Sequence, residues 1–297
     1  MAVQAEYWKA AVIGKLFEEN PHLNRCKNAD EYVVGGVAVH SPQSGGPSGV
    51  QRNPAYPLQI VTRADQEIIY ILEKYATKAI TVADMELAEL SYAKTDSIIT
   101  ENMSELIDFI GKDLLVKWAV NVTSAERILT TGAAFPATLP GSTGTRKIIT
   151  EADIRKAAVM MDNMLMPSTG RVLMLTPDMI DHLRGDDKLK YAFQQTIDIK
   201  TGVVGSLYGF DILKKPTVIN VDNAFAPKVP EALIAGTDNS CGIFYQQDQV
   251  ERALGSFNLY QNERRAEYQG DIVSMNVRMG GRNCRLDNKG VGLIVAA

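Results

Sequence analysis

Histidine and cysteine are two residue types in this sequence that could bind a metal ion or act as nucleophiles. The chain contains three of each, and only His22 and Cys26 are close enough in sequence to form a pair of ligands. A structural zinc site needs four ligands, but Pro21 disrupts the local helix and no second pair completes the set. We therefore predict no metal ion, no cofactor and no catalytic residue.

Two glycine-rich segments, GGPSG at 45–49 and GSTGTRK at 141–147, have the composition of phosphate-binding loops. Neither has the strand–turn–helix setting or the following residues that such loops require. An acidic cluster at 84–89 is more typical of a solvated face than of an acid–base pair. These patterns indicate that the chain is not an enzyme. A soluble enzyme with an unusual site within 168–250 remains the alternative.

Composition and charge exclude several classes of protein. The 297 residues carry a formal charge of −4, which argues against a surface that binds nucleic acid or anionic lipid throughout. No apolar run approaches the roughly 18 residues of a membrane span. Charged residues interrupt the N-terminal apolar stretch, so we expect no signal peptide. An odd number of scattered cysteines suits a reducing compartment. We expect a soluble intracellular protein.

The first element that the sequence predicts is a helix over residues 4–19. Trp8, Val12 and Leu16 follow an i, i+4, i+8 spacing, and Pro21 ends the helix. An apolar stripe of this kind must pack against another apolar surface. It is either docked on the rest of the chain or packed as an arm on another subunit, and both interpretations remain open.

Residues 30–84 have the pattern of long strands around a tip at 41–54. The tip contains three glycines, three prolines and three serines, and Val50 is its only sizeable apolar side chain. Ordering the backbone costs roughly 1–2 kcal/mol per residue, whereas burying one aliphatic side chain returns only about 1.5–3 kcal/mol. The tip is therefore mobile in a free monomer, or a partner holds it.

A long amphipathic helix is predicted over roughly 97–121, followed by a compact region of mixed structure. In that region, Thr150 and Asp153 form a capping box that begins a second helix. Residues 171–175 resemble a strand, which Thr176 and Pro177 end by beginning a third helix. Short strands are predicted at 202–215, 217–222, 231–237 and 241–246, and residues 272–279 alternate with the period of a strand.

This order of elements resembles the major capsid protein of tailed phages, which has the Hong Kong 97-like fold. The most telling segments are RVLMLTPDMIDHLRGDDK, followed by GVVGSLYGFDILKKPTV, and the C-terminal stretch ERALGSFNLYQNERRAEYQGDIVSMNVRMGGRNC. The resemblance covers nearly the whole chain, but its motifs are structural patterns with no catalytic signature.

The resemblance implies an α+β capsid fold with an N-terminal arm, an extended β-hairpin loop, a long spine helix, a peripheral domain and an inserted axial domain. The implied divisions are an arm at 1–29, the loop and its connection at 30–96, the peripheral domain with the spine helix at 97–167, the axial domain at 168–250, and a return to the peripheral domain at 251–297.

The implied function is self-assembly, through exchange of arm and loop, into an icosahedral virion shell that encloses phage DNA. Partners would be other copies of the chain in pentamers and hexamers, separate scaffolding, portal and decoration proteins, and non-specifically held DNA, with no membrane. Assembly would occur in the host cytoplasm. An encapsulin-like nanocompartment shell remains an alternative. We predict that the subunit interface includes Trp8, Val12, Leu16, Gln51, Arg52, Tyr56, Arg264 and Arg265.

Overall fold

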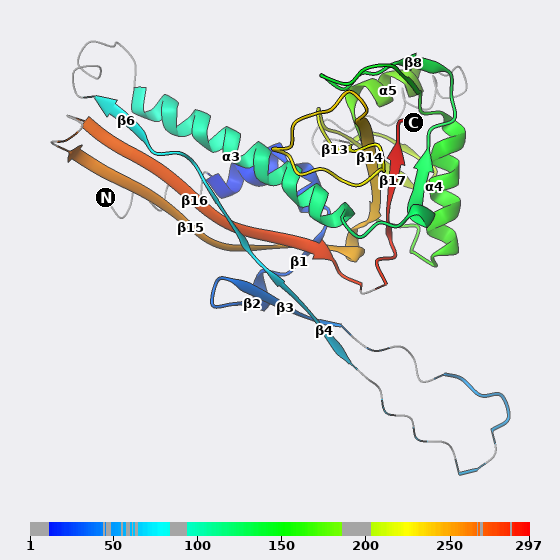
Figure 1. The fold of residues 1–297 in the computed structure, drawn as a ribbon. Helices are drawn as coiled ribbons and strands as arrows, with labels where there is room; N and C mark the ends of the chain where they lie inside the picture. The colour runs from blue at the N-terminus through cyan, green and yellow to red at the C-terminus, as the bar shows by residue number, and fades with distance from the viewer. Residues whose placement is uncertain are drawn as a thin grey trace.

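The computed structural model describes residues 12–43, 45, 49–54, 56–57, 60, 62, 65–83, 94–185, 203–265, 267, 270–285 and 287–297. Figure 1 shows a long arm built on one helix and two long strands, which is joined to a compact lobe of sheet and helices. A narrow extension leaves the junction and points away from both.

The compact lobe is built on a seven-stranded sheet. Six strands follow the order β11-β12-β10-β14-β17-β7, and β13 pairs with β14. The bounds are β7 Arg127–Leu129, β10 Arg171–Leu175, β11 Val203–Leu207, β12 Phe210–Lys214, β13 Ile219–Val221, β14 Asn239–Gln246 and β17 Val291–Val295. Two helices, α4 (Glu151–Asn163) and α5 (Pro177–Arg184), cover one face and share an apolar core with it.

The long arm consists of one helix on a second sheet. Helix α3 runs over Lys94–Ala119, and the sheet contains β1 (Lys27–Asn28), β5 (Glu73–Ala76), β6 (Ile80–Ala83), β15 (Val250–Arg265) and β16 (Gly270–Asn283). Strand β16 lies in the middle of this sheet, between β15 on one side and β5 and β6 on the other. The main core joins α3, β16 and the second face of the lobe's sheet.

Smaller elements complete the structure. Strands β2 (Val33–Val34), β3 (Ala38–Gln43) and β4 (Gln66–Ile71) form a three-stranded sheet at the base of the narrow extension, and β8 (Ala134–Pro136) and β9 (Thr145–Lys147) form a hairpin. Short 3-10 turns lie at η1 Pro21–Asn24, η2 Asp30–Tyr32, η3 Ser124–Glu126 and η4 Gln247–Gln249.

Several predictions from local pattern are confirmed. Helix α3 matches the predicted amphipathic helix within three residues at each end. Alternate residues of β16, from Val273 to Met279, are buried in the main core. The capping box exists, because Thr150 N and Oγ1 donate to Asp153 Oδ2 at 3.0 and 2.9 Å. Thr176 and Pro177 begin α5.

The prediction of a strand at 231–237 is wrong. Asp238 is buried and accepts a hydrogen bond from Ala235 N at 2.7 Å. It also forms an ion pair with Lys228 Nζ at 2.6 Å. Lys228 Nζ also donates to Leu233 O. These contacts satisfy the local polar groups within a turn, so no ladder of strand hydrogen bonds is needed.

The compact lobe draws on segments outside residues 168–250, and the domain bounds expected from the resemblance remain a prediction. The sheet that holds residues 168–250 also includes β7 and β17, and α4 covers it. Strand β17 pairs antiparallel with β14 and parallel with β7, and all five of its residues are buried. A strand that is buried on both faces lies in the interior of a sheet, so β17 belongs to the lobe.

Candidate assembly surfaces

The segment that precedes the first strand packs on its own chain. Val12 and Leu16 lie in a helical segment over residues 12–19, are each 2% exposed and belong to the main core. Their assignment to a subunit interface is therefore corrected, because their apolar stripe already covers this chain's own core. Trp8 lies outside the described residues, so its assignment remains a prediction.

A polar joint fastens this segment to α3 and to the lobe. Asn20, which is buried, donates from Nδ2 to Ile107 O at 3.1 Å and accepts from Lys215 Nζ at 2.5 Å. Arg25 forms an ion pair with Asp211 on β12. The joint therefore fixes the chain from Val12 onward at the meeting point of arm and lobe.

Gly111 on α3 tests this packing. A Cβ atom there would overlap Asn20 Oδ1 and lie 2.8 Å from Lys215 Nζ. Glycine to alanine normally stabilises a helix by about 1 kcal/mol, but overpacking costs about 1–3 kcal/mol. We expect Gly111→Ala to lower the free energy of unfolding, measured by denaturant titration. The matched control is Gly14→Ala, in an exposed helical position with open space around it, which should raise stability slightly. Stabilisation by Gly111→Ala would contradict the packing.

His22 is a second buried titratable group at this joint, in addition to Lys215. The ring is 0% exposed, packs edge-on against Trp118, and Nε2 lies 3.1 Å from Gly111 O, so this nitrogen carries the proton and donates. Nδ1 is buried and has no hydrogen-bond partner. Burial, reinforced by the charge of Lys215, holds the pKa of His22 well below its ordinary value of 6.5. His22 is therefore neutral in the folded chain.

This pKa shift predicts how stability depends on pH. Below about pH 6.5 the unfolded chain protonates His22 and the folded chain does not, so the unfolded state binds more protons and stability falls as pH falls. One such group contributes a slope of at most about 1.4 kcal/mol per pH unit. We expect His22→Gln to reduce the slope between pH 6.5 and 5, measured by denaturant unfolding. Identical slopes in both proteins would refute the prediction.

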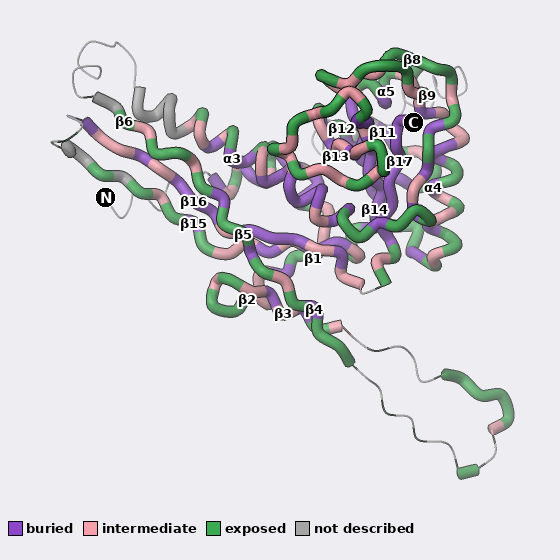
Figure 2. Tube along the Cα trace, in the orientation of Figure 1, coloured by how far each residue is buried: buried purple, intermediate pink, exposed green. Residues whose placement is uncertain are grey.

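The extension between β3 and β4 exposes both apolar and polar side chains. Its described residues lie away from the rest of the chain (Figures 1 and 2). Gln51 and Arg52 are exposed, Tyr56 is 83% exposed, and Val50 and Ile60 are almost fully exposed. The predicted interface residues of this segment are therefore all accessible to a partner. No described contact within the chain covers their side chains.

A groove of about 920 Å³ lies on the arm between α3 and the chain that links β5 to β6. Its apolar lining includes Leu106, Phe109 and Ile80. The exposed charged residues that line it are two acidic and two basic ones: Glu105, Glu231, Lys74 and Lys78. Sequence reasoning missed these residues. Glu231 comes from a loop more than a hundred residues away in sequence, and only the tertiary structure brings it beside α3.

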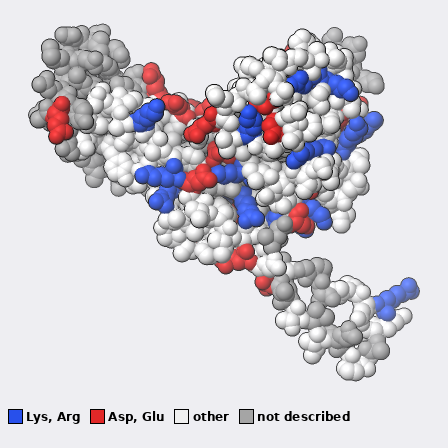
Figure 3. Space-filling view, viewed as in Figure 1, with Lys and Arg blue, Asp and Glu red and all other residues white. Residues whose placement is uncertain are grey.

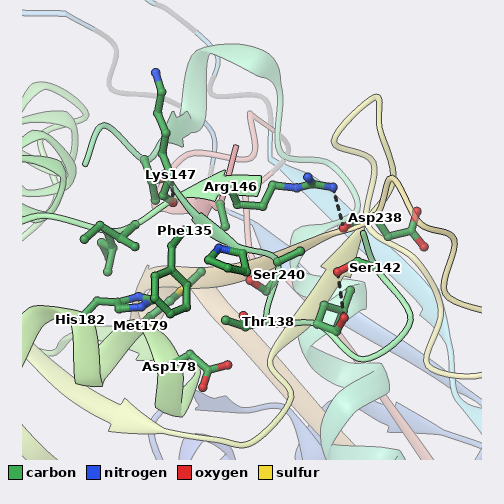
Figure 4. A pocket seen from close by; sticks show the side chains of 17 residues that line it. Phe135, Thr138, Ser142, Arg146, Lys147, Asp178, Met179, His182, Asp238 and Ser240 are labelled. Carbon is green, nitrogen blue, oxygen red and sulfur yellow. Dashed lines mark hydrogen bonds between the residues drawn. The ribbon is translucent and has the colours of Figure 1, made fainter. Parts of the chain in front are cut away.

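A second pocket lies next to α5 and is lined by ionisable and hydroxyl side chains, which are the groups that an enzyme's active site would need (Figure 4). Its volume is only about 20 Å³, which is room for about one water molecule. Several groups that line it have partners: Asp238 pairs with Lys228, Arg146 donates to Asn239, and His182 packs edge-on against Phe135 at 4.8 Å between ring centres. The space that remains is too small for a substrate.

The remaining candidate groups also lack the arrangement of a reactive site. Burial raises the pKa of all three cysteine thiols, to about 12 for Cys26. Among the described residues, no three metal-ligating side chains gather at one point, and no helix is long and apolar enough to cross a membrane. The acidic cluster at 84–89 lies outside the described residues.

Charges on the face shown in Figure 3 are mixed, with basic and acidic side chains interspersed over the arm and the lobe. The backbone of Arg264 and Arg265 forms the far end of β15, but their side chains lie outside the described part of the structure. Their assignment to a subunit interface remains a prediction.

Comparison with known proteins identifies the fold. No family model matches the chain, and no curated protein matches it significantly. Among solved structures, the capsid of cyanophage P-SCSP1u is 17% identical, with a TM-score of 0.64 over 92% of this chain and 86% of that chain. The capsid of Ralstonia phage GP4 is 10% identical, with a TM-score of 0.65 over 92% and 87%. The head of Helicobacter pylori bacteriophage KHP40 is 13% identical, with a TM-score of 0.61 over 91% and 89%.

The chain has the fold of a tailed-phage capsid protein. The resemblance of its sequence to that family and the α+β class are confirmed. Because the likeness covers 92% of this chain and 86–87% of the two capsid chains, it concerns the fold of most of the chain and not one lobe alone. At these identities the likeness concerns the fold, and no residue is assigned a role from it.

Proposed function

We propose that this chain is the major subunit of a tailed-phage capsid, which assembles with copies of itself into a closed shell around DNA. The observation that carries the proposal is the full-length capsid fold combined with an extension whose described side chains the chain itself leaves uncovered. Its role in the virion is structural. The lobe would be the axial domain, with β7, α4 and β17 added to the expected bounds, and α3 would be the spine of the peripheral domain.

The extension supplies the contact between neighbouring copies in this proposal. It presents the apolar side chains of Val50 and Ile60, and the groove on the arm presents an apolar lining. This apolar match supports seating the extension of one copy on the groove of the next. Each contact is weak alone, and closure of the shell multiplies the contacts.

Other partners follow from the same proposal. Pentamers and hexamers would close the shell, with separate scaffolding, portal and decoration proteins, in the host cytoplasm. The mixed charge on the face shown in Figure 3 and the net charge of −4 support a shell that confines DNA without binding it tightly.

Negative-stain electron microscopy and light scattering of the purified chain test the proposal. We expect closed particles of uniform size as concentration rises. A protein that stays monomeric across concentration and salt would overturn it. An encapsulin-like compartment would also form closed shells, so gene context separates the two: portal and terminase genes favour the virus, and a cargo enzyme favours the compartment.

A further inference from the structure

The three-stranded sheet at the base of the extension has two faces of different character. Cross-strand partners share a face, and the row Val33–Val39–Tyr70 faces inward, where Val39 is fully buried. Ile68 also points inward and is 2% exposed. The inner face therefore packs on the chain, against a small core that includes Leu72 and Ala253.

The outer face is apolar and uncovered. The row Val34–Ala38–Ile71 faces outward, and Ile69 lies beside it. Val34, Ile69 and Ile71 are 58%, 51% and 68% exposed. A strand with one face in water normally alternates apolar residues on the inner face with polar residues on the outer face, whereas strands that are apolar on both faces are covered on both faces. Strand β4 has isoleucine on each side, which is the pattern of a strand covered on both faces.

The side-chain charges and the backbone hydrogen-bonding groups of this face indicate which class of partner can bind it. The titratable strand residues on it are His40 and Glu67, and His40 Nδ1 lies 2.6 Å from Glu67 Oε1. No lysine or arginine of these strands lies on the face, so it offers an anionic partner such as DNA no row of cationic side chains. Strand β4 pairs only with β3 among the described residues, so its second edge keeps backbone groups that an incoming strand could pair.

We propose that the outer face of β2-β3-β4 is an interface that a second copy of this chain covers. The inference rests on the proposed function, and it names a surface that is distinct from the extension itself. The sheet is the root of that extension, since β3 leads into it and β4 leads out. A neighbouring copy that holds the extension is therefore brought close to its root, and an apolar face there suits contact with protein.

The test introduces charge on this face in the full-length chain. Ile69→Lys combined with Ile71→Lys should keep the thermal midpoint of the subunit, because both side chains are exposed, and should reduce particle formation at least tenfold by light scattering. The matched control is Val159→Lys combined with Leu165→Lys, which adds the same charge at exposed apolar positions in and after α4. Hydrogen exchange on assembled wild-type chain should show new protection of β4 amides.

The outcomes separate this inference from the proposed function. Particles formed normally by the Ile69/Ile71 variant, or β4 amides that exchange equally in subunits and particles, would overturn the interface and leave shell formation standing. A control variant that blocks assembly as strongly would also overturn it, because added charge alone would then explain the effect. Wild-type chain that never assembles would refute both proposals.

Discussion

Replacing residues 44–65 with an Asn-Gly turn is expected to leave the subunit folded and to reduce shell formation by about 100-fold or more. Gln43 and Gln66 are paired across β3 and β4, so a two-residue turn of this type can close the hairpin without changing the register. Each halving of loop length lowers the entropic cost of closure by about 0.6 kcal/mol. The shortened subunit should therefore be as stable as the wild type, or slightly more stable.

Measurement of this variant combines denaturant unfolding of the subunit with electron microscopy of concentrated protein. A full-length control with Val50, Tyr56 and Ile60 changed to serine keeps the length of the extension but removes its apolar side chains. It therefore separates the contribution of these side chains from that of the length of the extension. If exposed apolar groups make the contact, the control should also assemble poorly while keeping the wild-type stability. Normal yields of intact shells from the shortened chain would refute the role assigned to the extension.

Trp118→Ala is expected to lower the free energy of unfolding by about 3–5 kcal/mol. Trp118 is 1% exposed and lies in α3 where the arm meets the lobe. Its ring packs against Tyr245 at 5.3 Å and His22 at 5.9 Å, and Nε1 donates to Glu251 O at 3.0 Å. Truncation removes the ring contacts with β14 and η1 and the hydrogen bond to β15. The carbonyl of Glu251 then loses the donor that Trp118 supplies.

Circular dichroism is the suitable readout for this variant, because removing a tryptophan alters the fluorescence signal directly. Trp118→Phe is the matched control, since it keeps an aromatic ring and loses the hydrogen bond, and it should cost about 1–3 kcal/mol. A loss below about 1 kcal/mol for Trp118→Ala would mean that this face of α3 contributes little to the core.

Local sequence patterns were sufficient to predict the helices and strands that are determined by residues close together in the sequence. The spacing of apolar residues predicted α3, period-two alternation predicted the buried face of β16, and Thr176 with Pro177 predicted the start of α5. The uncovered character of the extension also followed from composition, because glycine, proline and serine offer little surface to bury. The resemblance in the order of these elements led to the fold that the solved capsid structures confirm.

The other features of the fold depend on contacts between segments that are far apart in the sequence. Local sequence patterns do not indicate these contacts. The stripe of Val12 and Leu16 suited either a neighbour or the chain itself, and only the position of α3 shows that it is covered within the chain. The lobe's sheet is completed by β7 and β17, which stand more than 150 residues apart, and Glu231 reaches the groove from a distant loop. Periodicity reveals which face of an element is buried, whereas its partner is set by the packing of segments that only the folded chain brings together.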